Sequence, residues 1–570
     1  MDFKTFLENF DAIAEAPGGI QKLRSLILAL AVRGKLVPQN PEDEPAELLR
    51  NQIVVEKQNL EKSKKIAKQR SLTPVQENEQ PYLLPSNWCW CRWNDVALHI
   101  GDIDHKMPTE VFEGIPYVSP RDFKKENTID FEGAKKISYE DFERLKRKVQ
   151  PTKGDIIFPR YGTIGENRLV EVDIDFLASY SCTVIKNFHG YIEPKYSYYY
   201  SISKLVKSEI ERYTNKTTQA NVGIQSIQNF IYPLPPLAEQ KRIVEKVDEL
   251  MALCDNYEAA KQTRDNLRQQ LRGSAINSLM NAETDEELDA SWEFVRDNWQ
   301  NLSQQPEDVG DLREATLHLA VRGKLVSQNF NDEPASALLK RAQIEKKSLL
   351  KAGSIKKNIS LSPISKDEKQ FVLPANWEWV RGQDISIFVT SGSRGWAQYY
   401  SSSGAIFIRV GNLDYGTIEL DLESLQFVNP PEGAEGTRTR VARNDILISM
   451  TGDTGMIGLV RSELLEAYIN QHIGLLRPVR CIYAEYIARF LSSNLALKQL
   501  KQAQRGIKNS LGLEDIRNLV ISLPPIDEQK RIVAKVDELM QLCDQLEDSL
   551  LQSQQRAESL AASAISHLTI

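Results

Sequence analysis

The second half of the chain ends in a regular alternation of apolar and polar positions. Apolar residues recur there at intervals of four and three, which is the seam of a coiled coil: Ile532, Val536, Leu539, Cys543, Leu546 and Leu550. A matching seam begins at Ile243 and fades at Lys261 and Arg264. Because these stretches hold no proline, we predict a long helix over 237–280 and another within 523–570. A helix of about 44 residues is a rod of ~66 Å, and its apolar seam needs a partner, for which the other rod is the nearest candidate.

The stretches outside these helices follow a different pattern. Short runs of β-branched and aromatic residues lie between glycine, proline and asparagine turns, for example IPYVSP, GDIIFP and NDILISM. A helical pattern at Tyr483–Lys501 alternates with such runs. We therefore predict compact mixed α/β domains of about 140–150 residues. A stretch rich in lysine and glutamine precedes each domain, at 56–80 and 345–370, and is predicted to be a helix that runs into a mobile linker.

The chain is an internal duplication. LAVRGKLV at 30–37 recurs at 319–326, and Pro-x-Asn-Trp-x-Trp at 85–90 recurs at 374–379. The segment LPPLAEQKRIVEKVDELMALCD at 234–255 returns as LPPIDEQKRIVAKVDELMQLCD at 523–544, with 18 of 22 positions identical. Each element recurs after 289 residues, so two full copies cover the chain and predict pseudo-twofold symmetry.

Similarity between the copies is uneven. The inserts at 92–220 and 381–508 scarcely match, apart from a common frame at 154–165 and 444–455. A shared scaffold with two different inserts indicates one architecture that presents two recognition surfaces; drift of exposed loops after an old duplication is the alternative. The predicted fold class is α+β, with two mixed α/β domains separated by long antiparallel coiled-coil helices. The predicted parts are an N-terminal helical region (1–82), a first insert domain (83–233), a central region with a long helix and the repeated element (234–371), a second insert domain (372–522) and a C-terminal long helix (523–570).

Composition and charge narrow the class of protein only a little. The formal net charge is −7, and the excess acid lies in helical segments such as Glu283–Asp297, whereas each insert is about neutral. Charge therefore permits binding to nucleic acid without favouring it. No apolar run reaches the ~18–20 residues that span a bilayer, and the six cysteines lack the spacing of a disulfide framework. We expect a cytoplasmic protein.

Catalytic and metal-binding motifs are not found in complete form. Asn429-Pro-Pro-Glu432 has glutamate where adenine methyltransferases carry the aromatic residue that stacks on a flipped base. The glycine-rich segment 452–458 lacks the Lys-Ser/Thr ending that grips phosphate, and the cysteine and histidine spacing does not fit zinc. Asp102 and Asp104 before Lys106 fit a solvated loop better than a nuclease centre. We predict a chain that is not an enzyme and holds no metal or cofactor.

The remaining polar residues of the inserts suit DNA. Arginine reads guanine, glutamine and asparagine read adenine, and lysine and arginine seat phosphates. A basic run at 144–148 could serve the DNA backbone. The candidate DNA-binding residues are Arg121, Arg160, Tyr161, Lys216 and Gln219 in the first insert, and Arg394, Arg409, Arg438, Arg440, Gln504, Arg505 and Lys508 in the second.

The order of the repeated elements resembles a known family. Each copy has an insert that begins with Pro-x-Asn-Trp-x-Trp and is followed by Leu-Pro-Pro-(Leu/Ile)-x-Glu-Gln-Lys-Arg-Ile-Val at the start of a long helix. The whole chain is similar to the specificity subunits of type I restriction-modification enzymes, which act in antiviral defence. The motif positions that carry over are expected to serve as scaffold and to dock partners: Pro235, Pro236, Glu239, Gln240, Pro524, Pro525, Glu528 and Gln529.

The resemblance implies a function. Each insert would be a target recognition domain that reads one half of a bipartite, asymmetric site in double-stranded DNA. The long helices would set the spacing of the half-sites and dock two modification subunits, which bind S-adenosylmethionine and methylate adenines. Restriction subunits would add ATP- and Mg²⁺-dependent translocation and cleavage. The alternative is a coiled-coil protein-binding scaffold with two related modules.

Overall fold

The computed structural model divides the chain into two compact units, which are described separately. The first unit comprises 1–264 and 553–570, and the second comprises 265–552. The structure describes residues 10–103, 107–125, 127–214, 220–356, 360–392, 394–433, 437–464, 466–506 and 509–569. The second unit begins within one long helix and ends within another, so each unit holds parts of both copies.

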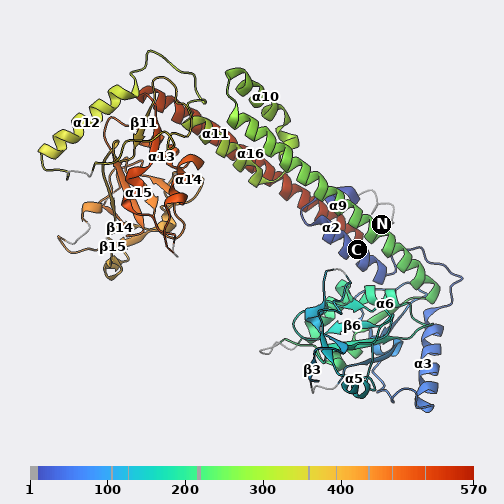
Figure 1. Cartoon of the computed structure of the whole chain (residues 1–570). Helices are drawn as coiled ribbons and strands as arrows, with labels where there is room; N and C mark the ends of the chain where they lie inside the picture. The colour runs from blue at the N-terminus through green and yellow to red at the C-terminus, as the bar shows by residue number, and fades with distance from the viewer. Residues whose placement is uncertain are drawn as a thin grey trace. The chain divides into compact units, whose positions relative to one another are not determined.

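The first unit contains the first insert domain and the helices around it (Figure 1). Its helices are α2 (Gly19–Val32), α3 (Ala46–Lys62), α4 (Trp93–Val96), α5 (Tyr139–Leu145), α6 (Pro194–Ser201), α7 (Lys204–Tyr213), α8 (Ile224–Asn229) and the first part of α9 (Leu237–Asn281). Its strands are β1 (Cys89–Arg92), β2 (Ala97–Gly101), β3 (Glu110–Val111), β4 (Ile115–Val118), β5 (Lys135–Ile137), β6 (Ile156–Pro159), β7 (Arg168–Leu169), β8 (Leu177–Ala178), β9 (Cys182–Asn187) and β10 (Ile231–Leu234). Single 3-10 turns are η1 (Glu77–Glu79) and η2 (Pro120–Asp122).

Two small sheets form the body of this domain. One has the order β2-β9-β6-β7 and is antiparallel; the other has the order β3-β5-β4-β8, with β4 and β8 parallel. Apolar residues fill the space between them, including Val118, Phe142 and Phe176. A larger core, which includes the fully buried Trp93, joins the first sheet to α2, α3 and α9. The predicted mixed α/β domain is confirmed, because helices and strands share these cores.

The second unit repeats this plan. Its helices are the end of α9, α10 (Asp285–Leu302), α11 (Gly310–Val321), α12 (Ala335–Lys351), α13 (Ala484–Leu491), α14 (Asn494–Ala503), α15 (Leu513–Asn518) and most of α16 (Ile526–Thr569). Its strands are β11 (Glu378–Arg381), β12 (Ser386–Ser391), β13 (Tyr400–Ser401), β14 (Ala405–Ile408), β15 (Gln426–Val428), β16 (Ile446–Ser449), β17 (Ile457–Leu459), β18 (Ala467–Ile469), β19 (Ile473–Pro478) and β20 (Val520–Leu523). Single 3-10 turns are η3 (Pro306–Val309), η4 (Trp396–Tyr399), η5 (Val410–Asn412) and η6 (Thr437–Thr439). The sheet orders β12-β19-β16-β17 and β13-β15-β14-β18 match those of the first unit strand for strand.

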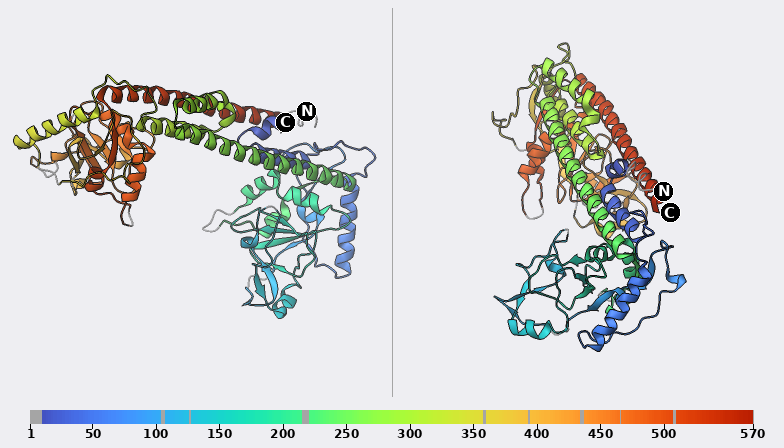
Figure 2. Two further views of the ribbon diagram at one scale, coloured as in Figure 1. Left: turned by 45° about the horizontal axis from the view of Figure 1, so that its top comes forward. Right: turned by 90° about the vertical axis from the view of Figure 1, so that its right-hand side faces the viewer.

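The two long helices run antiparallel, as predicted. In the first unit Ala561, near the end of α16, shares an apolar cluster with Val247 and Cys254 in the first half of α9. In the second unit Ile276, near the end of α9, shares a cluster with Cys543 of α16. Figure 2 shows α9 as one continuous helix. Part of the predicted seam therefore lies in apolar clusters that the two helices share, whereas Ile532 and Val536 of α16 pack in the core of the second insert domain.

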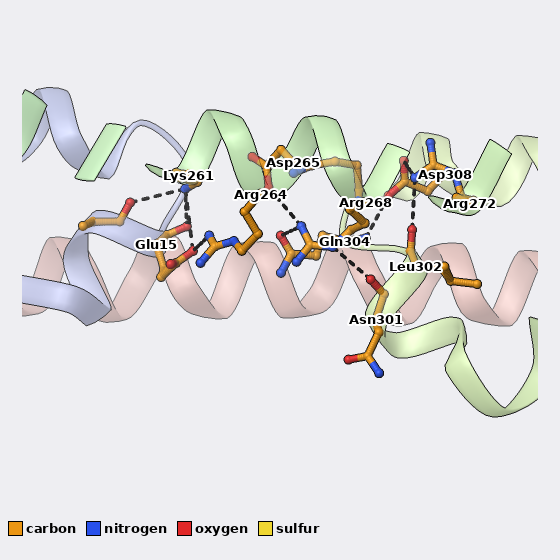
Figure 3. Close-up of polar contacts among 12 residues, drawn as sticks. Glu15, Lys261, Arg264, Asp265, Arg268, Arg272, Asn301, Leu302, Gln304 and Asp308 are labelled. Carbon is orange, nitrogen blue, oxygen red and sulfur yellow. Dashed lines mark hydrogen bonds and ion pairs between the residues drawn. The ribbon is translucent and has the colours of Figure 1, made fainter. Parts of the chain in front are cut away.

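The apolar seam of α9 fades where its residues make polar contacts with two other segments of the chain, around Glu15 and at 301–308 (Figure 3). In the first unit Lys261 donates to the carbonyl oxygen of Glu15 at 2.9 Å, and Arg264 donates to the Glu15 carboxylate at 2.8 Å. In the second unit Arg268 donates to Gln304 at 2.7 Å, and Arg272 pairs with Asp308 at 2.8 Å. The equivalent positions of α16 are Leu550, Ser553, Ala557 and Ala561. Hydrogen bonds and ion pairs thus replace apolar packing along this part of α9.

Two details differ from the prediction. The helix predicted over Tyr483–Lys501 is broken into α13 and α14, because the Ser493 side chain accepts from the amide of Ala496 and caps a new helix. The segment before the first insert domain was predicted to be mobile, but it is tied to the domain. Gln69 donates to the carbonyl oxygen of Leu98 at 2.7 Å, and the buried Arg92 donates to that of Thr73 at 2.9 Å.

Among the helices that the structure describes, none is long and apolar enough to cross a membrane.

Candidate nucleic-acid interface

The start of each long helix is fixed by a buried glutamate. Glu239 is 1% exposed, and its carboxylate accepts from the Trp88 indole at 2.9 Å and from the Gln39 amide at 2.6 Å. Burial raises the pKa of Glu239. The same contacts in the second unit join Glu528 to Trp377 (3.1 Å) and Gln328 (2.6 Å). Each glutamate therefore ties the long helix to the loop after LAVRGKLV and to the Pro-x-Asn-Trp-x-Trp segment.

The neighbouring glutamine ties the helix to the insert domain. The side chain of Gln240 accepts from the backbone amide of Glu193 at 2.9 Å and donates to the carbonyl oxygen of Pro235 at 3.1 Å. The backbone N–H of Gln240 donates to the carbonyl oxygen of Pro236. In the second unit Gln529 makes the equivalent bonds to Tyr483, Pro524 and Pro525. All eight motif residues are buried. They lie inside their units, and their predicted part in docking partners stays a prediction.

Each insert domain is joined to the scaffold through one pair of adjacent strands. β1 pairs antiparallel with β10 in the register Cys89↔Leu234, and β11 pairs with β20 in the register Glu378↔Leu523. Both residues of the second register lie 289 positions after those of the first. The chain thus enters and leaves each domain at one place and in one register, which makes the domain a self-contained insert.

Each domain carries a polar cleft at the same place in its fold. The first cleft has a volume of about 720 Å³ and the second about 940 Å³. Three segments build each of them: the 3-10 turn after β4 or β14, the glycine loop after β6 or β16, and the turn after β8 or β18. Those strands start 290 residues apart in all three cases. The frame is therefore common to both domains, and the side chains on it differ.

The first cleft combines cations, phenols and hydroxyls. Its polar residues are Tyr117, Ser119, Arg121, Asp122, Lys135, Tyr161, Thr163, Ser179, Tyr180 and Ser181. The exposed Arg121 side chain makes no hydrogen bond or ion pair with a described residue, and Tyr161 lies on the glycine loop beside it. Two of the predicted DNA-binding residues therefore lie together here and present free polar groups to solvent.

Arg160 lies under the first cleft. It is 6% exposed, donates to Asp102 at 2.5 Å and to the carbonyl oxygen of Tyr180 at 2.9 Å, and lies 5.4 Å from the Tyr161 ring. Asp102, which we expected in a solvated loop, is paired with this buried arginine because it follows β2 directly beside it. These contacts fix the glycine loop from below; Asp104 and Lys106 lie outside the described residues.

The second cleft carries a different set of polar groups. They are Arg409, Asn412, Ser424, Thr451, Asp453, Asn470, His472 and Asn509. The guanidinium Nε of Arg409 is buried and has no hydrogen-bond partner within the described chain. Asn470 accepts from the backbone amide of His472 at 3.1 Å, which fixes the turn after β18. Amides and an imidazole take the place of the phenols of the first cleft, while Ser424 and Thr451 keep hydroxyls in it.

The other predicted residues of the second insert that the structure describes do not line this cleft. Arg438 donates to Thr390 and Ser391, and Gln504 donates to Thr454. Arg505 pairs with Asp515 at 2.6 Å while 71% of its side chain stays exposed. Arg394 and Arg440 are exposed. Lys216, Gln219 and Lys508 lie outside the described residues.

Sequence reasoning missed several cleft residues, among them Asp122, Lys135, Asp453, Asn470 and His472. Apart from Lys135, which begins β5, they belong to short turns, and all lie in segments that are far apart in sequence and meet only in the folded domain. In the basic run at 144–148, Arg144 pairs with Asp141 and Lys146 pairs with Glu143. Within the described part of the chain, no three acidic, cysteine or histidine side chains group as a metal site would require.

Comparison with known proteins agrees with this architecture. The profile of the type I restriction modification DNA specificity domain matches residues 85–264 and 407–553. Two relatives from Escherichia coli are similar over nearly their full length. The EcoAI specificity subunit is 30% identical, covering 93% of this chain and 90% of the relative, and the EcoEI specificity subunit is 31% identical, covering 95% and 93%.

Two solved structures align with lower similarity. One is a chain from a structure that shows the basis of complex assembly and conformational transition of the type I R-M system. It aligns with 19% identity over 86% of this chain and 99% of that one, and with a TM-score of 0.48. The HsdS subunit from Thermoanaerobacter tengcongensis aligns with 18% identity, the same coverage and a TM-score of 0.39. Because both scores are below 0.5, the assignment rests on the sequence matches. The chain belongs to the DNA specificity subunits of type I restriction-modification enzymes and is the non-catalytic, sequence-specific DNA-binding component of such a complex.

Proposed function

We propose that the two clefts each read one half of a split, asymmetric site in double-stranded DNA. The observation that carries this proposal is the equivalence of the clefts: one frame holds two different sets of polar side chains. Each base pair presents its own pattern of donors and acceptors in the major groove. Two readers with different side chains therefore select two different half-sites, whereas identical readers would select a symmetric one.

We further propose that α9 and α16 set the spacing between the half-sites. Both helices run from one unit into the other without a break, and proline is absent from both. A continuous helix resists bending and compression over its length. Its length then determines how many unread base pairs separate the half-sites.

The partners that we propose are two modification subunits and, in the restricting complex, restriction subunits. An apolar groove of about 570 Å³ between α10, α11 and α16 supports a protein contact on the scaffold; it is lined by residues that include Trp292, Trp299, Leu542 and Leu546. Leu253 and Leu542, which occupy equivalent positions of the two copies, are 41% and 47% exposed. A repeated surface of this kind suits a partner present in two copies.

In this proposal the chemistry belongs to the partners. The modification subunits bind S-adenosylmethionine and methylate adenine, the restriction subunits use ATP and Mg²⁺, and this chain holds no cofactor. The complex works on DNA in the cytoplasm.

An exchange of domains tests the proposal. Replacing Leu83–Pro233 with Val372–Ser522 keeps the scaffold register and gives a chain that carries the second domain twice. The exchanged chain and the wild type, each combined with the modification subunit, are compared by sequencing the methylated positions of genomic DNA. We expect the exchanged chain to direct methylation to a symmetric site made of two second half-sites. Retention of the original asymmetric site would refute separate readers.

A further inference from the structure

A basic run of the first unit lies outside the insert domain. Residues 62–70 begin with the last residue of α3 and contain five cations and no acid: Lys62, Lys64, Lys65, Lys68 and Arg70. All five are exposed, and no side chain among them makes a hydrogen bond or an ion pair with a described residue. By contrast, two of the four cations at 144–148 are neutralised by neighbouring acids. We call residues 62–70 the basic segment.

The second copy keeps this character with a different sequence. Lys347, Lys351 and Lys356 lie at the end of α12 and just beyond it, are exposed, and have no partner among the described residues. Between 346 and 356 the chain has no acidic residue. In the 289-residue register Lys351 matches Lys62, whereas Lys347 and Lys356 fall opposite Gln58 and Ala67, so a basic stretch recurs in the same region of the second copy but not position for position.

Ordinary helix chemistry accounts for only part of this charge. A cation in the last turn interacts favourably with the helix dipole, which explains Lys62 and Lys351. It does not explain the cations that lie beyond the helix end. Lys64 has a left-handed backbone, with φ of 55°, at the position where the second copy has Gly353 with φ of 69°. A side chain there costs backbone energy that glycine avoids, so the lysine is placed against the local preference.

The basic segment is held in a fixed place on the domain. Lys57 of α3, which is 8% exposed, donates to the carbonyl oxygens of Asn94 and Ala97 at 2.6 and 2.8 Å. Beyond the helix, Gln69 donates to the carbonyl oxygen of Leu98. Figures 1 and 2 both show α3 along the flank of the insert domain. Five like charges are thus concentrated on an anchored and exposed segment, where an array of anions would find them already gathered.

The strand that anchors the basic segment also leads to the first cleft. Leu98 lies at the start of β2, and Asp102, just after its end, pairs with Arg160 beneath the cleft. Four residues of strand span about 13 Å, which is close to the ~12 Å width of the DNA major groove. The anchor of the basic segment thus lies about one major-groove width along β2 from the residue beneath the cleft.

We propose that the basic segment, and its counterpart at 347–356, binds phosphates of the duplex beside each half-site without reading bases. This inference rests on the proposed function of the clefts and adds a second DNA contact outside the insert domains. The ligand is the regular array of phosphates of double-stranded DNA. Contacts of this kind fix the position of a reader on the duplex and carry no sequence information.

The test measures the salt dependence of binding by the complex of the chain with its modification subunit. Changing Lys62, Lys64, Lys65, Lys68 and Arg70 to glutamine removes five charges; changing the four lysines to arginine is the matched control that keeps them. Each lost phosphate contact lowers the slope of log K against log salt by about 0.9. We expect the glutamine variant to lose about 2 or more of the slope, equally on target and on scrambled DNA, and the arginine variant to keep the wild-type slope.

The possible outcomes separate the hypotheses. An unchanged slope in the glutamine variant overturns the phosphate contact. A glutamine variant that no longer associates with the modification subunit, while the arginine variant does, shows a protein-docking role and also overturns it. A wild-type complex that does not prefer its own methylated target over scrambled DNA contradicts the proposed function itself. Changing Lys347, Lys351 and Lys356 to glutamine should give a smaller loss of slope, in keeping with three charges.

Discussion

Lengthening both long helices is expected to widen the DNA spacer and leave the half-sites unchanged. The insertion points are the two junctions between the units: after Arg264 in α9 and after Gln552 in α16. Insertions at these points leave the polar contacts of Glu15 with Lys261 and Arg264 within the first unit, and leave those of Arg268 and Arg272 within the second. Both helices must be lengthened together because both cross the junction.

The size of the effect follows from helix geometry. Four residues add about 6 Å at ~1.5 Å per residue and turn the distal part by about 400°, which is only ~40° beyond a full turn. With a base pair rising ~3.4 Å, the preferred spacer should grow by roughly one or two base pairs. Two residues turn the distal part by about 200°, which faces one reader away from the duplex, and should abolish specific binding.

The assay presents the complex with a series of duplexes that differ only in spacer length. Methylation at each spacer is compared for the wild type, the four-residue variant and the two-residue variant. Thermal unfolding of each variant controls for loss of structure. If the four-residue variant prefers the original spacer as strongly as the wild type does, the helices do not set the spacing, and other contacts position the domains.

Two further predictions concern the buried glutamates Glu239 and Glu528 and the two clefts. Changing Glu239 or Glu528 to glutamine replaces one acceptor oxygen with an NH2 group, which then faces either the indole N–H or the glutamine N–H that the carboxylate accepted from. Each change should therefore lower the free energy of unfolding, measured by urea denaturation, by about 1–3 kcal/mol. Burial raises the pKa of both carboxyls. The wild type should therefore gain stability as the pH falls through the folded-state pKa toward the unfolded value of about 4.3, and each glutamine variant should lose the gain that comes from its own site. An identical pH dependence of the wild type and the variants would contradict a buried carboxylate. Changing Tyr161 to alanine should weaken binding by about 1–3 kcal/mol only where the first half-site is intact, and changing His472 to alanine should do so only for the second. Binding to duplexes with one half-site scrambled checks this, and a loss that both half-sites share equally would count against separate clefts.

Much of the scaffold could be predicted because its signals are local or repeated. The heptad seam and the lack of proline predicted a helix over 237–280, and α9 spans Leu237–Asn281. β-type runs bounded by turns predicted strands such as β4, β6 and β16. The repeat interval predicted a second unit of the same plan, which the matching sheet orders confirm.

The internal roles of the repeated motif residues were not visible in the sequence. Glu239 was predicted to belong to a scaffold, but its partners, Trp88 and Gln39, are 151 and 200 residues away in the chain. No local pattern links such distant residues. Only the folded unit brings the indole, the amide and the carboxylate together.

The clefts mark the limit of what a sequence of this kind determines by itself. The sequence determined the elements: helices from their apolar period, strands from their composition, and two copies from identity at a fixed interval. Tertiary structure decided which polar residues act together, because the sheet order β3-β5-β4-β8 and its partner sheet place three distant turns around one hollow. It also decided that Lys261 and Arg264, where the apolar seam fades, bind Glu15. The physical reason is the same in both cases: periodicity reports which face of an element is buried, whereas the partner of a polar side chain depends on what the completed fold brings within hydrogen-bond distance.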